Sequence, residues 1–217
     1  SKTAFGEISA TDANNKVFFV ASADNKTNTD GTENRSLWYK VKVTRSGNGY
    51  KVEYGKVEDT TPKTVEITKD PIYSFIGLSL ETGEQVLQPA KSKWDIMWAY
   101  AASSTMMASG PVISFTQDVI TINNLGGAET AIVMTDTKSY ADFKRADVAS
   151  AEFQTEANTI GTNWRTPAMP GVENPGVKAD RFSVIKDCAE NYYKLRFLKF
   201  GSGDDGERGR PQLEYEL

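Results

Sequence analysis

Methionine is the residue type through which this chain could do metal chemistry, because the chain has no histidine and only one cysteine. Its five methionines include Met134, at the end of the apolar run 131–134, and Met169, inside the proline-rich segment 163–178. A thioether sulfur is soft, neutral and not protonated at ordinary pH, so a pair of them can bind a soft transition metal. Methionine more often fills gaps in a hydrophobic core, and each position has to be weighed against that interpretation.

The surroundings of the methionines differ. Met169 lies between Ala168 and Pro170, where core packing gives little reason for a methionine. Met134 ends an apolar run, which suits a core residue as well as it suits a ligand. Met97 lies in an expected strand between two tryptophans, and we interpret it as a core residue.

The absence of histidine removes several catalytic arrangements. The chain can form no Ser-His-Asp triad, no histidine-based zinc site and no imidazole base that works near neutral pH. No pair of carboxylates stands out as the acid and base of a glycosidase. We therefore expect a protein that is not an enzyme.

Charge and cysteine content exclude further classes. The formal net charge is −4 and no basic block is present, so nothing favours binding to nucleic acid. Cys188 cannot form a disulfide within the chain, and we interpret it as a small buried apolar residue. Asp204, Asp205 and Glu207 lie among glycines but lack the spacing of a calcium-binding loop.

Most of the chain has the pattern of short strands separated by turns, which is typical of an all-β fold with several sheets. The turn at Asn48-Gly49 predicts a hairpin. The uncharged stretch 96–117 is too polar for a membrane helix, and we interpret it as two buried strands joined by a loop. Strands are predicted at 16–21, 37–44, 50–54, 64–68, 73–80, 85–87, 94–98, 111–115, 119–122, 131–134, 182–186, 192–200 and 212–217.

Two segments depart from this pattern. In 139–155, Tyr140 and Phe143 recur at helical spacing, which predicts one or two short helices. The segment 163–178 carries three prolines and is predicted to be a long loop without regular structure, of the kind that often carries function. No repeat or linker is evident, so we expect a single domain over residues 1–217.

Three blocks of sequence together resemble the HmuY family of haem-binding lipoproteins from Bacteroidetes. The resemblance covers roughly residues 64–217, and residues 1–63 are the least diagnostic part. The blocks are 73–75 with 83–86 and Lys93-Trp94-Asp95-Ile96, then Gly126-Gly127 followed by the strand 131–134, and then 193–197 followed by Gly209-Arg210 and the strand 212–216.

This resemblance implies an all-β, hand-shaped fold that holds haem, iron protoporphyrin IX, between finger-like loops. It implies a protein that is secreted or attached to the outer membrane through a lipid anchor that this chain does not contain. It also implies that the protein passes haem to a TonB-dependent outer-membrane receptor, with host haemoproteins as a candidate source.

The family's best-known axial ligands are two histidines, and this chain resembles members that use two methionines instead. Met134 stands in the place of the first ligand, and Met169, five residues after Trp164, in that of the second. Their separation (169 − 134 = 35) allows elements on opposite walls of a pocket to present them. Met106 and Met107 point to opposite faces if they lie on a strand, so only one of them could replace Met134.

Burial of the porphyrin faces should supply most of the affinity. Methionine ligation favours ferrous iron, so binding should depend strongly on redox state and weakly on mild acid. Candidates for the porphyrin walls are Met106, Met107, Tyr140, Phe143 and Phe153, and candidates for pairing with the propionates are Lys144, Arg145 and Arg165.

The rival hypothesis is a β-sandwich module for surface adhesion or glycan binding. Its support is the aromatic content of 11% and the all-β pattern. Exposed tryptophans lining a groove, with no deep cavity beside Met134 and Met169, would favour it.

Overall fold

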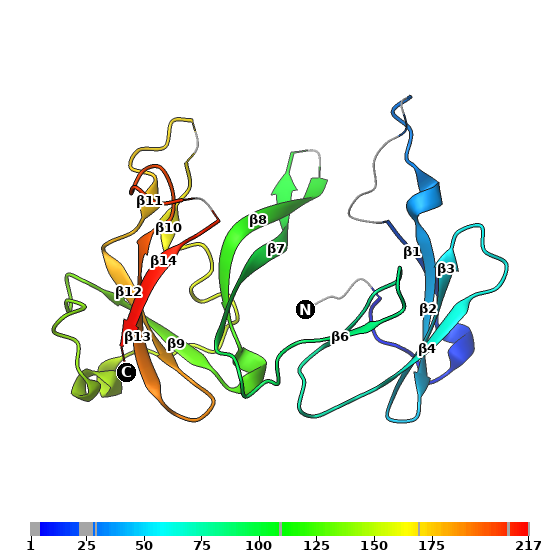
Figure 1. The fold of residues 1–217 in the computed structure, drawn as a ribbon, viewed down its shortest axis with the longest axis horizontal. Helices are drawn as coiled ribbons and strands as arrows, with labels where there is room; N and C mark the ends of the chain where they lie inside the picture. Colours follow the sequence, from blue (N-terminus) through cyan, green and yellow to red (C-terminus); the bar gives the residue numbers. More distant parts are fainter. Residues whose placement is uncertain are drawn as a thin grey trace. The chain divides into compact units, whose positions relative to one another are not determined.

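The computed structural model describes residues 5–21, 28, 30–108, 110–168, 170–207 and 209–216, with only the backbone described at 102–105, 107 and 111–114. Contacts between Cα atoms divide the chain into two compact units, Ser1–Gln88 and Pro89–Leu217 (Figure 1). The expected single domain over 1–217 stays a prediction.

The first unit is built on a four-stranded antiparallel sheet. The predicted hairpin is confirmed, since Ser46 pairs with Gly49 across a two-residue turn in which Gly47 has a φ of +50°. Val41, Val52 and Tyr54 form its buried core. In sheet order the strands are β1 (Val17–Val20), β2 (Tyr39–Ser46), β3 (Gly49–Lys56) and β4 (Lys63–Thr68), and the 3-10 segments are η1 (Asp12–Asn14) and η2 (Arg35–Leu37).

A small hairpin of β5 (Ile76–Leu78) and β6 (Gln85–Leu87) completes the first unit. The strand predicted at 73–80 is therefore shorter than expected. The Asp70 carboxylate accepts a hydrogen bond from the Ile72 backbone at 2.9 Å, and the Asp70 carbonyl accepts one from Tyr73 at 3.2 Å. This turn removes the first residues of the run from any ladder.

The second unit combines a four-stranded antiparallel sheet, a long two-stranded ribbon and a two-stranded pair. The sheet order is β14 (Gln212–Glu216), β13 (Tyr192–Lys199), β12 (Arg181–Lys186) and β9 (Glu129–Met134). The ribbon consists of β7 (Ile96–Met107) and β8 (Gly110–Ile122), and the pair of β10 (Arg165–Thr166) and β11 (Gly176–Val177). The 3-10 segments are η3 (Asn124–Gly126) and η4 (Arg145–Ser150).

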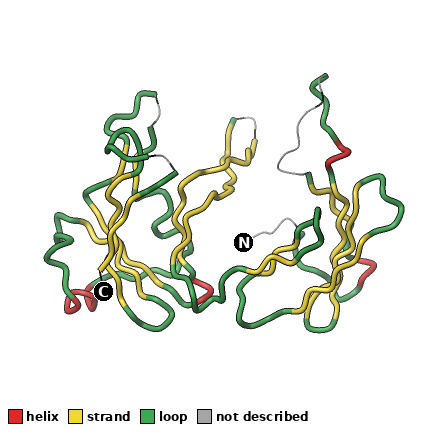
Figure 2. The backbone as a smooth tube through the Cα atoms, viewed as in Figure 1, coloured by secondary structure: helices red, strands yellow, loops and turns green. Residues whose placement is uncertain are grey.

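Strand β12 separates two cores, because its alternate residues point to opposite faces of the sheet. Ile185 packs in the larger core, where Trp164 stacks on Phe197 with ring centroids 4.2 Å apart. Phe182 and Val184 pack in the smaller core with Tyr140 and Phe143. The all-β class predicted from the sequence is confirmed, and the helical elements among the described residues are short 3-10 segments (Figure 2).

Three predictions about burial are wrong. Met97 was expected to be a core residue, but it is 41% exposed. The stretch 96–117 forms strands as expected, but Tyr100, Met106 and Phe115 are 71%, 77% and 77% exposed, because a two-stranded ribbon leaves much of its surface uncovered. Cys188 is exposed, since it lies in the turn between β12 and β13 rather than in a strand. Within the described residues no helix has both the length and the apolar character needed to cross a membrane.

Candidate functional site

The second unit contains a cavity of about 940 Å³, a volume in the range of cofactor and ligand sites. Four segments form its walls: the middle of β8, the region around β10, the region around β11, and the glycine-rich loop that follows β13. Its lining residues, called here the cavity region, are Phe115, Thr116, Gln117, Asp118, Thr162, Asn163, Arg165, Pro167, Ala168, Pro175, Gly176, Lys178, Phe200, Gly201, Ser202, Gly203, Gly206 and Glu207.

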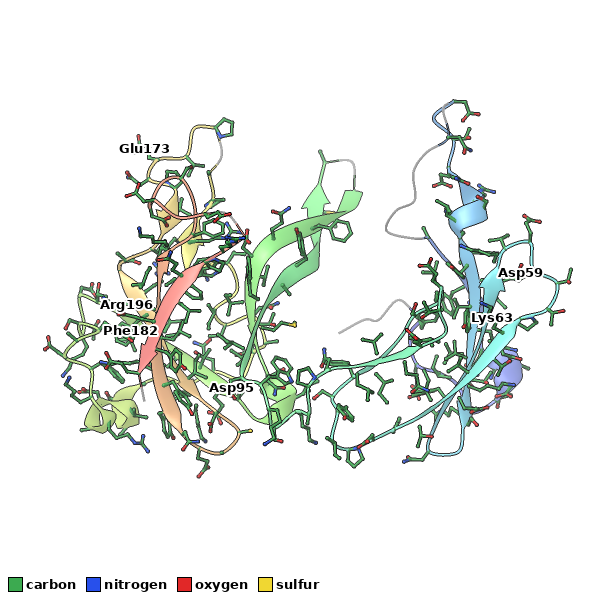
Figure 3. The ribbon with its side chains drawn as sticks, viewed as in Figure 1. Asp59, Lys63, Asp95, Glu173, Phe182 and Arg196 are labelled. Atoms are coloured by element: carbon green, nitrogen blue, oxygen red, sulfur yellow. The ribbon has the colours of Figure 1, made fainter. Side chains whose placement is uncertain are left out.

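The pair β10–β11 holds both ends of the proline-rich loop together. Arg165 pairs with Val177 and Thr166 with Gly176, so residues 167–175 project as a loop from a fixed base. The segment 163–178 was expected to lack regular structure, and these two-residue strands correct that prediction. Glu173 in this loop and Asp95 next to β7 lie at opposite ends of the unit (Figure 3).

The proline-rich loop contributes Pro167, Ala168 and Pro175 to the cavity lining. Ala168 lines the cavity, and Met169 itself lies outside the described residues. The predicted ligand is therefore the next residue in sequence after one that lines the cavity.

Arg165 lines the cavity, but its guanidinium group holds the wall together. It forms an ion pair with Asp118 at 3.7 Å, and these two side chains are only 7% and 9% exposed. It also donates a hydrogen bond to the Gln117 carbonyl at 2.6 Å and lies 5.1 Å from the ring of Phe200. Arg165 thus ties β10 to β8, at a point where Asp118 has a φ of +58° and the ribbon changes register.

Lys178 supplies the cavity with a cation that has no such role. It is partly buried, and its ammonium group makes no ion pair or hydrogen bond with any described residue. A cation of this kind can pair with a carboxylate of a bound molecule without first breaking a contact of the wall.

The glycine-rich loop is organised by Asp204. Its Oδ1 accepts hydrogen bonds from the backbone N–H groups of Phe200 and Gly201 at 2.9 Å and of Gly206 at 3.2 Å, and its Oδ2 accepts one from Val177 at 2.8 Å. Burial raises the pKa of the Asp204 carboxyl, but these four donors outweigh that effect and leave its pKa below the ordinary value. Asp204 is therefore held as a carboxylate, and both of its oxygens accept hydrogen bonds from backbone N–H groups.

The register of the β7–β8 ribbon decides which of two adjacent methionines shares a face with the cavity. Phe115 lines the cavity and pairs with Ala102, while Met106 pairs with Pro111. Directly opposed residues lie on one face of a ribbon, and so do residues two apart along a strand. Met106 therefore lies on the face of Phe115, and Met107 lies on the opposite face.

Met134 is placed elsewhere. It is the last residue of β9, pairs with Arg181, is partly buried and is not among the residues that line the cavity. Its carbonyl accepts hydrogen bonds from the backbones of Thr137 and Lys138, each at 3.1 Å. Its role as an iron ligand stays a prediction.

Tyr140 and Phe143 lie on the same side of the sheet as each other and away from the cavity lining. They are 5% and 6% exposed, and each contacts the Phe182 ring edge-on, with centroids 5.4 and 5.5 Å away. Burial, together with the charges of Glu216 and Glu214, raises the pKa of Tyr140 to about 12, so its phenol stays protonated. The structure gives these two residues a packing role that spacing alone did not indicate.

The other expected contacts of the porphyrin also lie around η4. Phe153 packs on Tyr192 with centroids 5.7 Å apart, and the Arg145 guanidinium lies 4.1 Å from the same ring. Lys144 and Arg145 line a separate cleft of about 120 Å³. The predicted site residues are thus dispersed. Arg165 and Ala168, the neighbour of Met169, line the cavity, whereas Met106 and Met107 lie on β7 outside the lining. The others lie in the β9–η4 region, residues 129–153.

Sequence reasoning missed Phe115, Lys178 and Phe200 as cavity residues. Phe115 was assigned to a buried strand, and nothing in an apolar run indicates that its ribbon lacks a covering layer. The cluster of glycines around Asp204 was a usable signal, because closely spaced glycines indicate backbone segments in close approach. Within the described residues no group of three or more histidine, cysteine, aspartate or glutamate side chains could hold a metal ion.

Comparison with known families decides the identity. The family model for the HmuY protein matches residues 73–215, which is well over half of the chain. The chain belongs to the HmuY family. HmuY proteins bind haem in iron acquisition, are surface or secreted proteins, and are not known as enzymes. The match includes every residue of the cavity region, whereas searches of curated proteins and of solved structures gave no match.

Proposed function

We propose that this HmuY protein captures haem in the cavity region and holds the iron with two methionine sulfurs. The observation that carries the proposal is the cavity of about 940 Å³ beside Ala168, the residue next to Met169, in a chain whose family binds haem. A cavity of this size can enclose most of a planar macrocycle and remove its apolar faces from water.

The cavity region offers the contacts that haem requires. Phe115, which is 77% exposed, is the aromatic ring proposed to contact a porphyrin face. Lys178 is the cation proposed to pair with a propionate, because its ammonium group forms no ion pair or hydrogen bond with a described residue and interacts with Asp180 only through its charge. Arg165, first expected to fill that role, is better suited to keeping β8 and β10 at a fixed separation through Asp118.

Met169 is the proposed ligand from the proline-rich loop. The family resemblance implies Met134 as its partner, with Met106 or Met107 as the alternatives. The ribbon register supports Met106, since it lies on the face of Phe115 and is 77% exposed, as expected of a ligand that awaits its cargo. Thioether ligation makes ferrous haem the preferred cargo.

The steps before and after capture follow from family membership alone. We propose that the protein acts at the outer-membrane surface, held there by a lipid anchor, or after secretion. Host haemoproteins are the proposed source of haem, and a TonB-dependent outer-membrane receptor is the proposed recipient.

The experiment is a titration with haemin, with and without dithionite, followed by absorbance. We expect a Soret band that sharpens on reduction, and a loss of the six-coordinate spectrum in Met169→Leu, which keeps the volume but removes the sulfur. Met97→Leu is the matched control, because Met97 lies on β7 outside the cavity lining. Absence of any spectral change in both redox states would refute haem binding.

One observation favours the alternative of a glycan-binding module. Trp98 and Tyr100 are 41% and 71% exposed, and with Asp118 they line a shallow cleft of about 280 Å³. Binding to a glycan array that disappears in Trp98→Ala, combined with no response to haemin, would support this alternative. The much larger cavity in the same unit makes haem the better-supported ligand.

A further inference from the structure

Asp204 joins two walls of the cavity that are distant in sequence. Its Oδ1 gathers three backbone N–H groups of its own loop, and its Oδ2 reaches Val177, 27 positions earlier. The loop contributes Gly201, Ser202, Gly203 and Gly206 to the cavity lining. The neighbours of Val177, Gly176 and Lys178, belong to the other wall of the cavity, so the Asp204 carboxylate connects the two walls.

The glycines on both sides of this contact are required by the close approach. A Cβ atom at Gly176 would lie 2.8 Å from Asp204 Oδ2, and one at Gly206 would lie 2.8 Å from Asp204 Oδ1. A Cβ at Gly203 would collide with the Pro175 carbonyl. Gly176 also has a φ of +130°, which an L side chain rarely adopts. The local sequence therefore allows two backbone segments to meet around one carboxylate.

We propose that Asp204 is a positioning residue for the haem site, which fixes the loop 200–206 against β11 and thereby sets the separation of these two cavity walls. The proposal rests on the proposed function, because it is the haem cavity that the two walls enclose. Since β11 pairs with β10, the same contact also fixes the base of the loop that carries Ala168 and Met169.

Asp204→Asn tests this assignment with a minimal change. An amide has one acceptor oxygen, so it can keep the three bonds within its own loop or the bond from Val177, but not both sets. We expect the three bonds to be retained and the link between the walls to be lost. Asp205→Asn is the matched control: Asp205 is exposed, its carboxylate bonds to no described residue, and its φ of +56° suits asparagine.

The first measurement is amide hydrogen exchange on the protein without haem. In Asp204→Asn the Val177 amide should exchange about tenfold faster or more, while Val184 in the buried strand β12 keeps its wild-type rate. Asp205→Asn should leave both rates unchanged. A Val177 amide that keeps its wild-type protection in Asp204→Asn would overturn the link between the walls.

The second measurement is the rate at which each variant loses ferrous haem to an excess of apomyoglobin. We expect Asp204→Asn to release haem about tenfold faster with the six-coordinate spectrum retained, and Asp205→Asn to match the wild type. Faster exchange at Val177 with unchanged haem release would contradict the positioning role. If the wild type bound no haem, the proposed function would fail, and the exchange data would still decide whether the link exists.

If Asp204→Asn does not fold, the proposal can be tested on the wild-type protein. Haem that fills the space between the two walls should further slow exchange at the Val177 and Gly206 amides. Equal exchange at both amides with and without bound haem would overturn the proposal.

Discussion

Two regions of the second unit contain similar side chains but differ in how far they expose them to solvent. In the cavity region Phe115 is 77% exposed and the Lys178 ammonium group forms no ion pair or hydrogen bond with a described residue. In the β9–η4 region Tyr140 and Phe143 are 5% and 6% exposed and pack against Phe182. Aromatic and cationic composition is thus shared, and the uncovered surface is what distinguishes a binding site from a core.

The comparison also separates the candidate iron ligands. Met134 belongs to the β9–η4 region, whereas Met106 lies on the face of the ribbon that Phe115 shares with the cavity. The family pattern therefore implies Met134 as the ligand, whereas the strand register supports Met106. Substitutions in the two regions should therefore have different effects on haem binding and on stability.

The largest effect is expected from replacing methionines on either side of the comparison. Met106→Leu should abolish six-coordinate ferrous haem, because it removes one axial sulfur, and Met134→Leu should retain it. Absorbance or resonance Raman spectra of the reduced complexes distinguish the two outcomes. Met107→Leu is the control on the opposite face of the ribbon. The reverse result, loss in Met134→Leu alone, would assign the ligand to the β9–η4 region.

Two phenylalanines provide the next test. Phe143→Ala should lower the free energy of unfolding by about 3–5 kcal/mol, because it leaves a cavity in a packed core. Phe115→Ala should leave stability nearly unchanged and weaken haem binding, because an exposed ring contributes little to the fold. Chemical denaturation and haem titration of each variant give the four values. Weakened haem binding by folded Phe143→Ala would place the site in the β9–η4 region.

Two lysines allow a smaller version of the same test. Lys178→Met should weaken haem binding about tenfold, since a charge-assisted hydrogen bond to a propionate is lost. Lys144→Met should have no effect, because Lys144 lines the separate cleft near η4. Competition binding with haem and its dimethyl ester adds a readout: only the propionate form should distinguish Lys178→Met from the wild type.

The smallest effect is expected from mild acid. The pKa of Asp204 is lowered in the folded protein, so its stabilising contribution is complete above the ordinary carboxyl value of 3.8 and is lost only as pH falls through the lower folded value. Thioether sulfur takes up no proton in this range, so haem affinity should stay nearly constant between pH 7.5 and 5. In Met169→His the affinity should fall below about pH 6.5, where imidazole becomes protonated. A wild-type affinity that falls in the same way would contradict methionine ligation.

Much of the fold could be predicted from the sequence, because strand and turn signals are local. The alternation in 37–44 and 50–54 and the turn between them predicted β2 and β3. The last three strands, β12, β13 and β14, were also predicted from their local sequence patterns. The prediction for 73–80 was wrong at its start, where the turn at Asp70 competes with the ladder. Segments 111–115 and 119–122, predicted as separate strands, belong to one strand. The pairing register shifts at Gln117 and Asp118 without ending the strand.

The candidate site was only partly predictable. The proline-rich loop was identified from composition, and Arg165 was identified as a site residue, although its guanidinium proved to serve the wall. Tyr140 and Phe143 were predicted to contact the porphyrin because they are apolar and lie near the expected ligand. The identity of an aromatic residue does not indicate whether it lies in a core or in a pocket. Lys178 was missed because the ability of a lysine to pair with a ligand carboxylate depends on which other charges lie near it in the folded protein.

By itself the sequence determined the all-β class, the family, and a chemistry that excludes imidazole, because these depend on residue identity and short-range spacing. Only the tertiary structure decided that β8, β10, β11 and the Asp204 loop enclose one cavity, and that Met106 shares a face of the ribbon with the cavity residue Phe115. The physical reason is that pairing register and packing against distant segments determine which apolar side chains are covered. Those contacts join residues far apart in the chain, where local sequence carries no signal.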